Sequence, residues 1–152
     1  DLMPLPRIYH DTTNQELIRR IDALHSQSVR LWGKMTVAQM LKHCMVPYKG
    51  LLSDKPVPSK MRLLGRLFFK SMLTNEKPFR KNSPTSAPFL IKEEPDFEEA
   101  KQQLKEKMLA VHHKGETFFE GKAHPFLGKL TAVGWSNMLY KHLDHHLRQF
   151  GV

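Results

Sequence analysis

The chain has 152 residues and carries 24 Lys and Arg against 15 Asp and Glu, a formal net charge of +9 with histidine neutral. This length fits one domain, so we treat residues 1–152 as a single unit. Hydrophobic residues make up 40% and charged residues 26%, a globular composition that excludes disorder throughout. The single cysteine excludes an internal disulfide framework and a cysteine-rich zinc cluster, and it indicates a reduced, cytoplasmic location.

Helical periodicity dominates the chain from its beginning. No stretch approaches the roughly 20 apolar residues of a membrane-spanning helix, so no membrane contact is expected. Alternating patterns typical of half-buried strands are scarce. The first helix is predicted from Asn14 to Leu24, with N-cap side chains between Asp11 and Thr13. The expected fold class is therefore all-α.

The second helix has the clearest start signal in the chain. Gln39 follows Thr36 by three residues, which is the pattern of a capping box. Pro47 lies inside the helical pattern, where it removes one backbone donor and is expected to bend the helix near His43. The apolar face is predicted to contain Val37, Met40, Leu41, Cys44, Tyr48 and Leu51.

A third helix is predicted between two loops that contain prolines. Leucines and other apolar residues recur at helical spacing from Leu63 to Met72, with an interruption at Gly65. The loops are predicted at 55–60 and at 78–88. The second loop is long, so neighbouring helices are not all expected to be joined by tight hairpins.

Two more helices complete the expected fold. The first of them is predicted to begin at Asp96 and to stop at Gly115, a residue suited to the left-handed conformation after a helix end. The last is predicted from Thr131 to Gln149. Helices of this number and length, joined by loops, indicate a small helical bundle.

The last predicted helix carries the most informative histidines. At about 100° per residue, His142 and His146 fall inside the apolar stripe, whereas His145 lies at its margin. Two imidazoles four residues apart on a buried face can hold one metal ion. The alternative is a pair of core histidines bonded to carbonyls or hydroxyls, and the spacing alone favours neither. No glutamate adjoins His142, which excludes the zinc-protease motif.

A metal site there needs a further protein ligand. His43 is the first candidate, because it lies on the strongly capped second helix at the margin of the apolar stripe. His124, in an aromatic-rich loop, is the second candidate. The other histidines are predicted at the surface or near helix ends, and they are His10, His25, His112 and His113. The adjacent pair His112 and His113 lies near a helix C-terminus, where interaction with the helix dipole explains their presence.

Three segments of the chain resemble the DinB/YfiT-like superfamily. Residues 32–44 (WGKMTVAQMLKHC) are similar to its second-helix motif. Residues 124–131 (HPFLGKLT) and 140–151 (YKHLDHHLRQFG) are similar to its final loop and helix. The match is closest to a domain-of-unknown-function branch of that superfamily, and the order of the helices extends the resemblance to most of the chain.

The resemblance implies a DinB-like four-helix bundle with long connecting loops and a divalent metal, zinc or nickel, held by three histidines. In this sequence they are His43, His142 and His146. It also implies a metal-dependent transferase that acts with a low-molecular-weight thiol on a small-molecule substrate, with hydrolase-like relatives as a variant. The branch brings no assigned substrate, and the sequence identifies no catalytic base. Asp144 and His145 match the branch without being implied as ligands.

A basic segment supports a different hypothesis, a non-catalytic binding or assembly module. Residues 54–81 contain eight Lys and Arg against two acidic residues, interleaved with phenylalanines. Such a surface can bind an anionic ligand, but no base-reading motif is present and nucleic-acid binding is not expected. Related bundles form dimers, so the resemblance also implies a homodimer. Cys44 falls in an apolar stripe and is interpreted as a structural thiol.

Overall fold

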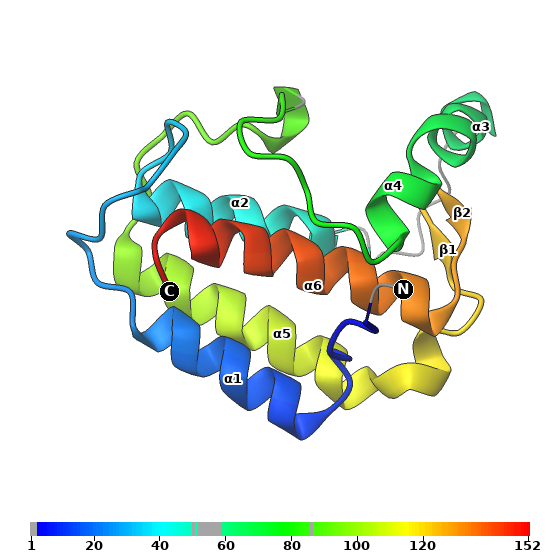
Figure 1. Cartoon of the computed structure of the whole chain (residues 1–152), viewed down its shortest axis with the longest axis horizontal. Coiled ribbons are helices and arrows are strands. Elements are labelled where there is room, and N and C mark those ends of the chain that lie inside the picture. The colour runs from blue at the N-terminus through cyan, green and yellow to red at the C-terminus, as the bar shows by residue number, and fades with distance from the viewer. Residues whose placement is uncertain (1–2, 50, 52–58, 86) are drawn as a thin grey trace.

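The computed structural model describes residues 3–49, 51, 59–85 and 87–152, and it is mostly helical (Figure 1). The all-α prediction is confirmed, because the described residues add only a two-stranded antiparallel hairpin. The helices are α1 (Asp11–Asp22), α2 (Val37–Lys49), α3 (Ser59–Phe68), α4 (Lys70–Thr74), α5 (Phe97–Phe119) and α6 (Ala132–Gln149). The short elements are the 3-10 turn η1 (Ala87–Phe89) and the strands β1 (Ala123–His124) and β2 (Gly128–Lys129).

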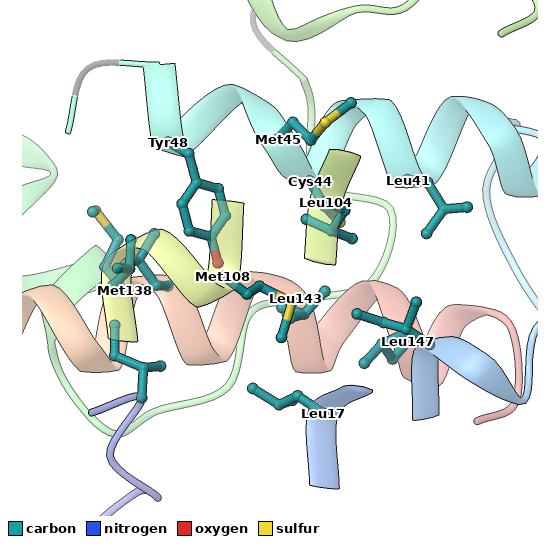
Figure 2. Close-up of a cluster of buried hydrophobic side chains, with 14 of the residues drawn as sticks. Leu17, Leu41, Cys44, Met45, Tyr48, Leu104, Met108, Met138, Leu143 and Leu147 are labelled. Carbon is teal, nitrogen blue, oxygen red and sulfur yellow. The ribbon is translucent and has the colours of Figure 1, made fainter. Parts of the chain in front are cut away.

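The core lies between α1, α2, α5 and α6, which run side by side (Figure 1). Both α1 and α2 contact α5 and α6, and α5 also contacts α6. Figure 2 shows buried side chains from all four helices, including Leu17, Tyr48, Leu104 and Leu143. None of the described helices is long and apolar enough to cross a membrane.

Helix α1 begins earlier than its apolar pattern predicts. It starts at Asp11 and not at Asn14, and its N-cap is His10, whose side chain makes no capping hydrogen bond. The predicted caps between Asp11 and Thr13 are therefore wrong. Asn14 instead donates from Nδ2 to the carbonyl oxygen of Ile8 at 2.8 Å. This bond joins the first turn of the helix to the segment that precedes it.

The capping box of α2 is confirmed. The backbone N–H of Thr36 donates to Gln39 Oε1 at 3.0 Å, and the N–H of Gln39 donates to Thr36 Oγ1 at 3.2 Å. The helix continues through Pro47 to Lys49. The predicted apolar face is buried at every position, with exposed fractions of at most 6% for Val37, Met40, Leu41, Cys44, Tyr48 and Leu51. The bend near His43 stays a prediction.

The predicted third helix is divided into α3 and α4. The division falls at Phe69, and not at Gly65. Figure 1 shows the pair projecting from the end of the molecule that carries β1 and β2. Helix α3 contacts β2, where the side chain of Arg66 lies against Gly128. Its apolar side chains are 56–68% exposed at Leu63, Leu64, Leu67 and Phe68.

The starts of α5 and α6 are confirmed, and the predicted end of α5 is corrected. Asp96 caps α5 by accepting from the N–H of Glu99 at 2.8 Å, and Thr131 caps α6 by accepting from the N–H of Gly134 at 3.0 Å. Gly115 breaks the helical backbone with φ 77°, but a further helical turn continues to Phe119. The side chain of Phe119 is fully buried, and this burial explains why the chain resumes the helix.

Candidate metal centre

Three histidines from α2 and α6 lie together in the structure. They are His43 on α2 and His142 and His146, one turn apart on α6. One ring nitrogen from each lies within 4.8 Å of the others. His43 Nε2 and His142 Nε2 are 3.0 Å apart, and the three ring centroids are separated by 4.6 to 4.8 Å. The helical spacing correctly predicts that His142 and His146 share one face.

Two of these rings are oriented by hydrogen bonds on their outer nitrogens. His43 Nδ1 lies 2.9 Å from the carbonyl oxygen of Phe89, which can only accept, so Nδ1 carries the proton. His146 Nδ1 lies 2.8 Å from Gln149 Oε1, while Gln149 Nε2 donates to the carbonyl oxygen of Trp32 at 2.9 Å. Both rings therefore keep an unprotonated Nε2, as metal-binding histidines do when their other nitrogen is bonded.

Burial keeps all three imidazoles neutral. It is the main cause that lowers the pKa of His43, and it lowers the pKa of His146 to about 4. The pKa of His142 is well below its ordinary value, first because of burial and then because His146 and His43 are close. Neutral rings expose nitrogen lone pairs near pH 7, the protonation state that a metal requires.

The donor set fits a divalent ion. Imidazole nitrogens suit zinc, nickel, copper and iron. Two imidazoles on one tetrahedral zinc ion place their nitrogens about 3.3 Å apart, close to the 3.0 Å between His43 Nε2 and His142 Nε2. Three protein ligands leave one position for water or a substrate. The arrangement can therefore hold an ion and present it to a small molecule.

Asp144 does not belong to this group, and the family resemblance does not imply it as a ligand. Its carboxylate pairs with Arg20 of α1 at 2.8 Å and with Arg148 at 3.0 Å. The residue therefore joins α6 to α1 on the side away from the histidines. Cys44 is 1% exposed, its Sγ donates to Met40 Sδ at 3.7 Å, and burial raises the pKa of its thiol. These contacts agree with a structural thiol.

The second candidate ligand, His124, is not part of the group. Its Nδ1 accepts from the backbone N–H groups of Phe126 and Leu127 at 3.0 and 3.2 Å, and its ring packs 5.2 Å from that of Trp135. It therefore shapes the β1–β2 turn. His112 is also not a solvated helix end, since its Nε2 lies 2.7 Å from Asp11 Oδ1 and joins α5 to α1.

Three further histidines occupy the surface, as predicted. His10, His25 and His113 are exposed. None of the three belongs to the three-histidine group. These exposed histidines contrast with His43 and His146, which are buried, and with His142, which is half-buried.

Sequence reasoning misses the residues that surround the histidines. Phe89 and Trp32 orient the rings through backbone carbonyls, which leave no signal in side-chain chemistry. Gln149 follows His146 by three residues, and that helical spacing is a signal that was available. His145 is half-buried, with its ring centroid 5.1 Å from that of His146. Burial is the main cause that lowers its pKa.

The fold and site define a mostly helical protein with a buried three-histidine group between two helices. The chain belongs to a family described as "Protein of unknown function (DUF1569)", whose model matches residues 7–151. No curated protein and no solved structure matched the chain.

Proposed function

We propose that the protein is a metal-dependent enzyme of the DinB/YfiT-like type, in which His43, His142 and His146 hold a divalent ion, zinc or nickel. One observation carries the proposal: three neutral imidazoles converge in a buried site, and two of them have outer nitrogens fixed by oxygen acceptors. Without an ion, His43 and His142 would instead share a single hydrogen bond between their Nε2 atoms, which lie 3.0 Å apart.

The location of the similar sequence motifs supports the same proposal. The motif at 32–44 supplies His43, and the motif at 140–151 supplies His142 and His146. The two motifs are about a hundred residues apart, yet their histidines meet. The packing of α1, α2, α5 and α6 is also what a DinB-like four-helix bundle requires.

The proposed reaction is transfer to or from a low-molecular-weight thiol, with a small molecule as the second reactant. A bound divalent ion would lower the pKa of a thiol or water in its open position. The three histidines would hold the ion, and Phe89 and Gln149 keep two of the imidazoles in the binding tautomer. The three-histidine group contains no carboxylate.

A second candidate function is assembly, including a homodimer. The observation that favours it is the apolar side of α3 and α4, where Phe68 is 68% exposed and Met72 is 51% exposed. Contiguous apolar surface of this kind marks interaction sites in soluble proteins. Sedimentation equilibrium of the untagged protein tests it: a dimer supports assembly, and a monomer at high concentration counts against it.

Metal content tests the proposed enzyme. The untagged wild type is expected to contain about one zinc or nickel ion per chain by elemental analysis, because three histidines are pre-oriented. His43→Ala and His142→Ala are expected to lose most of it, while the exposed His25→Ala serves as the matched control. Circular dichroism verifies folding. Full metal occupancy in the folded His43→Ala and His142→Ala variants would show that these histidines do not bind the metal.

A further inference from the structure

Beside the three-histidine group, two loops distant in the sequence meet around His145. The ring of Trp32, from the loop before α2, lies 5.6 Å from that of His145. The ring centroid of Phe79, from the loop after α4, lies 6.2 Å from that of His145. Lys81 follows in the same loop, and its Nζ lies 4.5 Å from the centre of the Trp32 ring. A continuous series of contacts therefore joins the histidines to one exposed ammonium group.

Both loops are anchored to α6. The backbone N–H of Leu31 donates to the carbonyl oxygen of Gln149 at 2.7 Å, which holds the first loop. Lys141 is 4% exposed and donates to Met72 O, Asn75 Oδ1 and Lys77 O at 2.8 to 3.1 Å. Its ammonium also lies 4.6 Å from the centre of the Phe79 ring. The segment that carries Lys81 is thus fixed beside the histidines.

The acidic side chains in this region already have polar partners, whereas Lys81 forms no ion pair among the described residues. The carboxylate of Asp144 is shared by Arg20 and Arg148, Glu93 pairs with Lys42, and Glu94 accepts from Thr36. Among the ion pairs of the described residues, none includes Lys81. An aromatic face holds an ammonium group in place without neutralising its charge. Lys81 therefore presents a positive charge on the Trp32 ring, which packs against His145.

We propose that Lys81, positioned by Trp32 and backed by His145, is a subsite for the carboxylate of a small ligand whose other end occupies the metal centre. The inference rests on the proposed function, which supplies the ion. A single ammonium group is a point charge that complements one monoanionic group. The ligand class is therefore a short thiol or related metal-binding molecule that carries a carboxylate.

The chain offers a matched control for Lys81. Lys114 also lies over an aromatic ring, with its Nζ 5.0 Å from the centre of Phe118. It is exposed and belongs to the kinked end of α5, which contributes nothing to the three-histidine group. Lys114→Met removes the same charge and the same type of contact as Lys81→Met. A difference between the two variants in ligand binding would therefore come from the position of Lys81 beside the three-histidine group.

The experiment uses cobalt(II)-loaded protein, whose absorption spectrum reports binding of a thiolate. Three thiols of similar size are titrated: 3-mercaptopropionate, 2-mercaptoethanol and cysteamine, which carry a negative, no and a positive charge. The wild type is expected to prefer 3-mercaptopropionate to 2-mercaptoethanol. Lys81→Met is expected to lower that preference by about five-fold, an effect of the size that one partly exposed charge produces. Lys114→Met keeps the wild-type preference.

Each outcome decides a separate question. Equal preferences in the wild type and Lys81→Met overturn the subsite, as does an equal loss in Lys114→Met. Those results do not contradict the proposed metal centre, because the absorption spectrum of bound cobalt(II) measures metal uptake independently of the added thiol. Failure of the folded wild type to take up cobalt overturns the proposed metal centre and the subsite together. Loss of the preference at high salt supports an electrostatic origin.

Discussion

Gln149 shows how one side chain connects the candidate centre to the rest of the protein. Its Oε1 accepts from His146 Nδ1, and its Nε2 donates to the carbonyl oxygen of Trp32. The residue is 4% exposed, so solvent does not replace either bond when it is lost. It therefore couples the orientation of a histidine ring to the loop that carries Trp32.

Replacing Gln149 with leucine tests this coupling. Leucine has a similar size but no acceptor, so His146 loses the bond that fixes its tautomer and ring orientation. We expect zinc affinity to fall by about ten-fold, the lower end of the range for such partners, while helical content is kept. A competitive chelator titration measures the affinity. Gln103→Leu is the control, because Gln103 is exposed and bonds only Glu99; an unchanged affinity in Gln149→Leu would contradict the coupling.

The elements differ in how much of their apolar surface they bury, and periodicity does not report that difference. The third helical segment has an apolar stripe as clear as that of α2, yet the stripe of α2 is buried and that of α3 is exposed. A stripe shows that one face is apolar. It does not show which side faces the protein.

Two phenylalanines provide a comparison of buried and exposed positions. Phe119 is 0% exposed and Phe68 is 68% exposed. Phe119→Ala is expected to lower the free energy of unfolding by about 3–5 kcal/mol, whereas Phe68→Ala is expected to change it by less than about 0.5 kcal/mol. Urea unfolding of both variants measures this. A loss for Phe68→Ala comparable to that for Phe119→Ala would show that the face of α3 is covered in solution.

Local signals predict those parts of the fold that depend on neighbouring residues. The reciprocal bonds of Thr36 and Gln39 and the cap at Thr131 follow from side chains within one helical turn. Helix α1 instead starts three residues before its apolar pattern predicts, and the bond from Asn14 to the Ile8 carbonyl is not visible in side-chain spacing. The turn after Gly115 depends on burial of Phe119 against Tyr9 and Trp135, from distant parts of the chain.

The same distinction applies to the candidate site. His142 and His146 share a face because of their spacing, so the sequence alone places them together. His43 comes from another helix. Its place on the capped second helix made it the first candidate ahead of His124, and the family resemblance mainly settled the choice. Lys81 and Phe89 lie in loops whose positions depend on bonds to α6 and α2, such as those donated by Lys141 and His43. Long-range contacts of this kind are not encoded in local patterns.

At the scale of the whole molecule, three neutral imidazoles at one site make the metal-free protein sensitive to acid. The rings of His43 and His146 each lie 4.8 Å from that of His142, and the ring of His145 lies 5.1 Å from that of His146. Each proton added is therefore opposed by burial and by neighbouring rings. In the unfolded chain the same groups titrate near 6.5 without that opposition. The unfolded state therefore binds more protons than the folded state below that pH.

The sign of the effect follows from the pKa of His146, which burial lowers from 6.5 to about 4. Stability is highest above pH 6.5 and falls as the pH drops towards 4, because the unfolded state takes up the proton first. At about 1.4 kcal/mol per pKa unit, His146 accounts for a loss on the order of 3 kcal/mol. Urea unfolding of chelator-treated protein at several pH values measures this, with His146→Leu as the comparison. Carboxylates titrate in both proteins, so their contribution cancels, and a pH dependence in His146→Leu as steep as in the wild type would contradict the assignment.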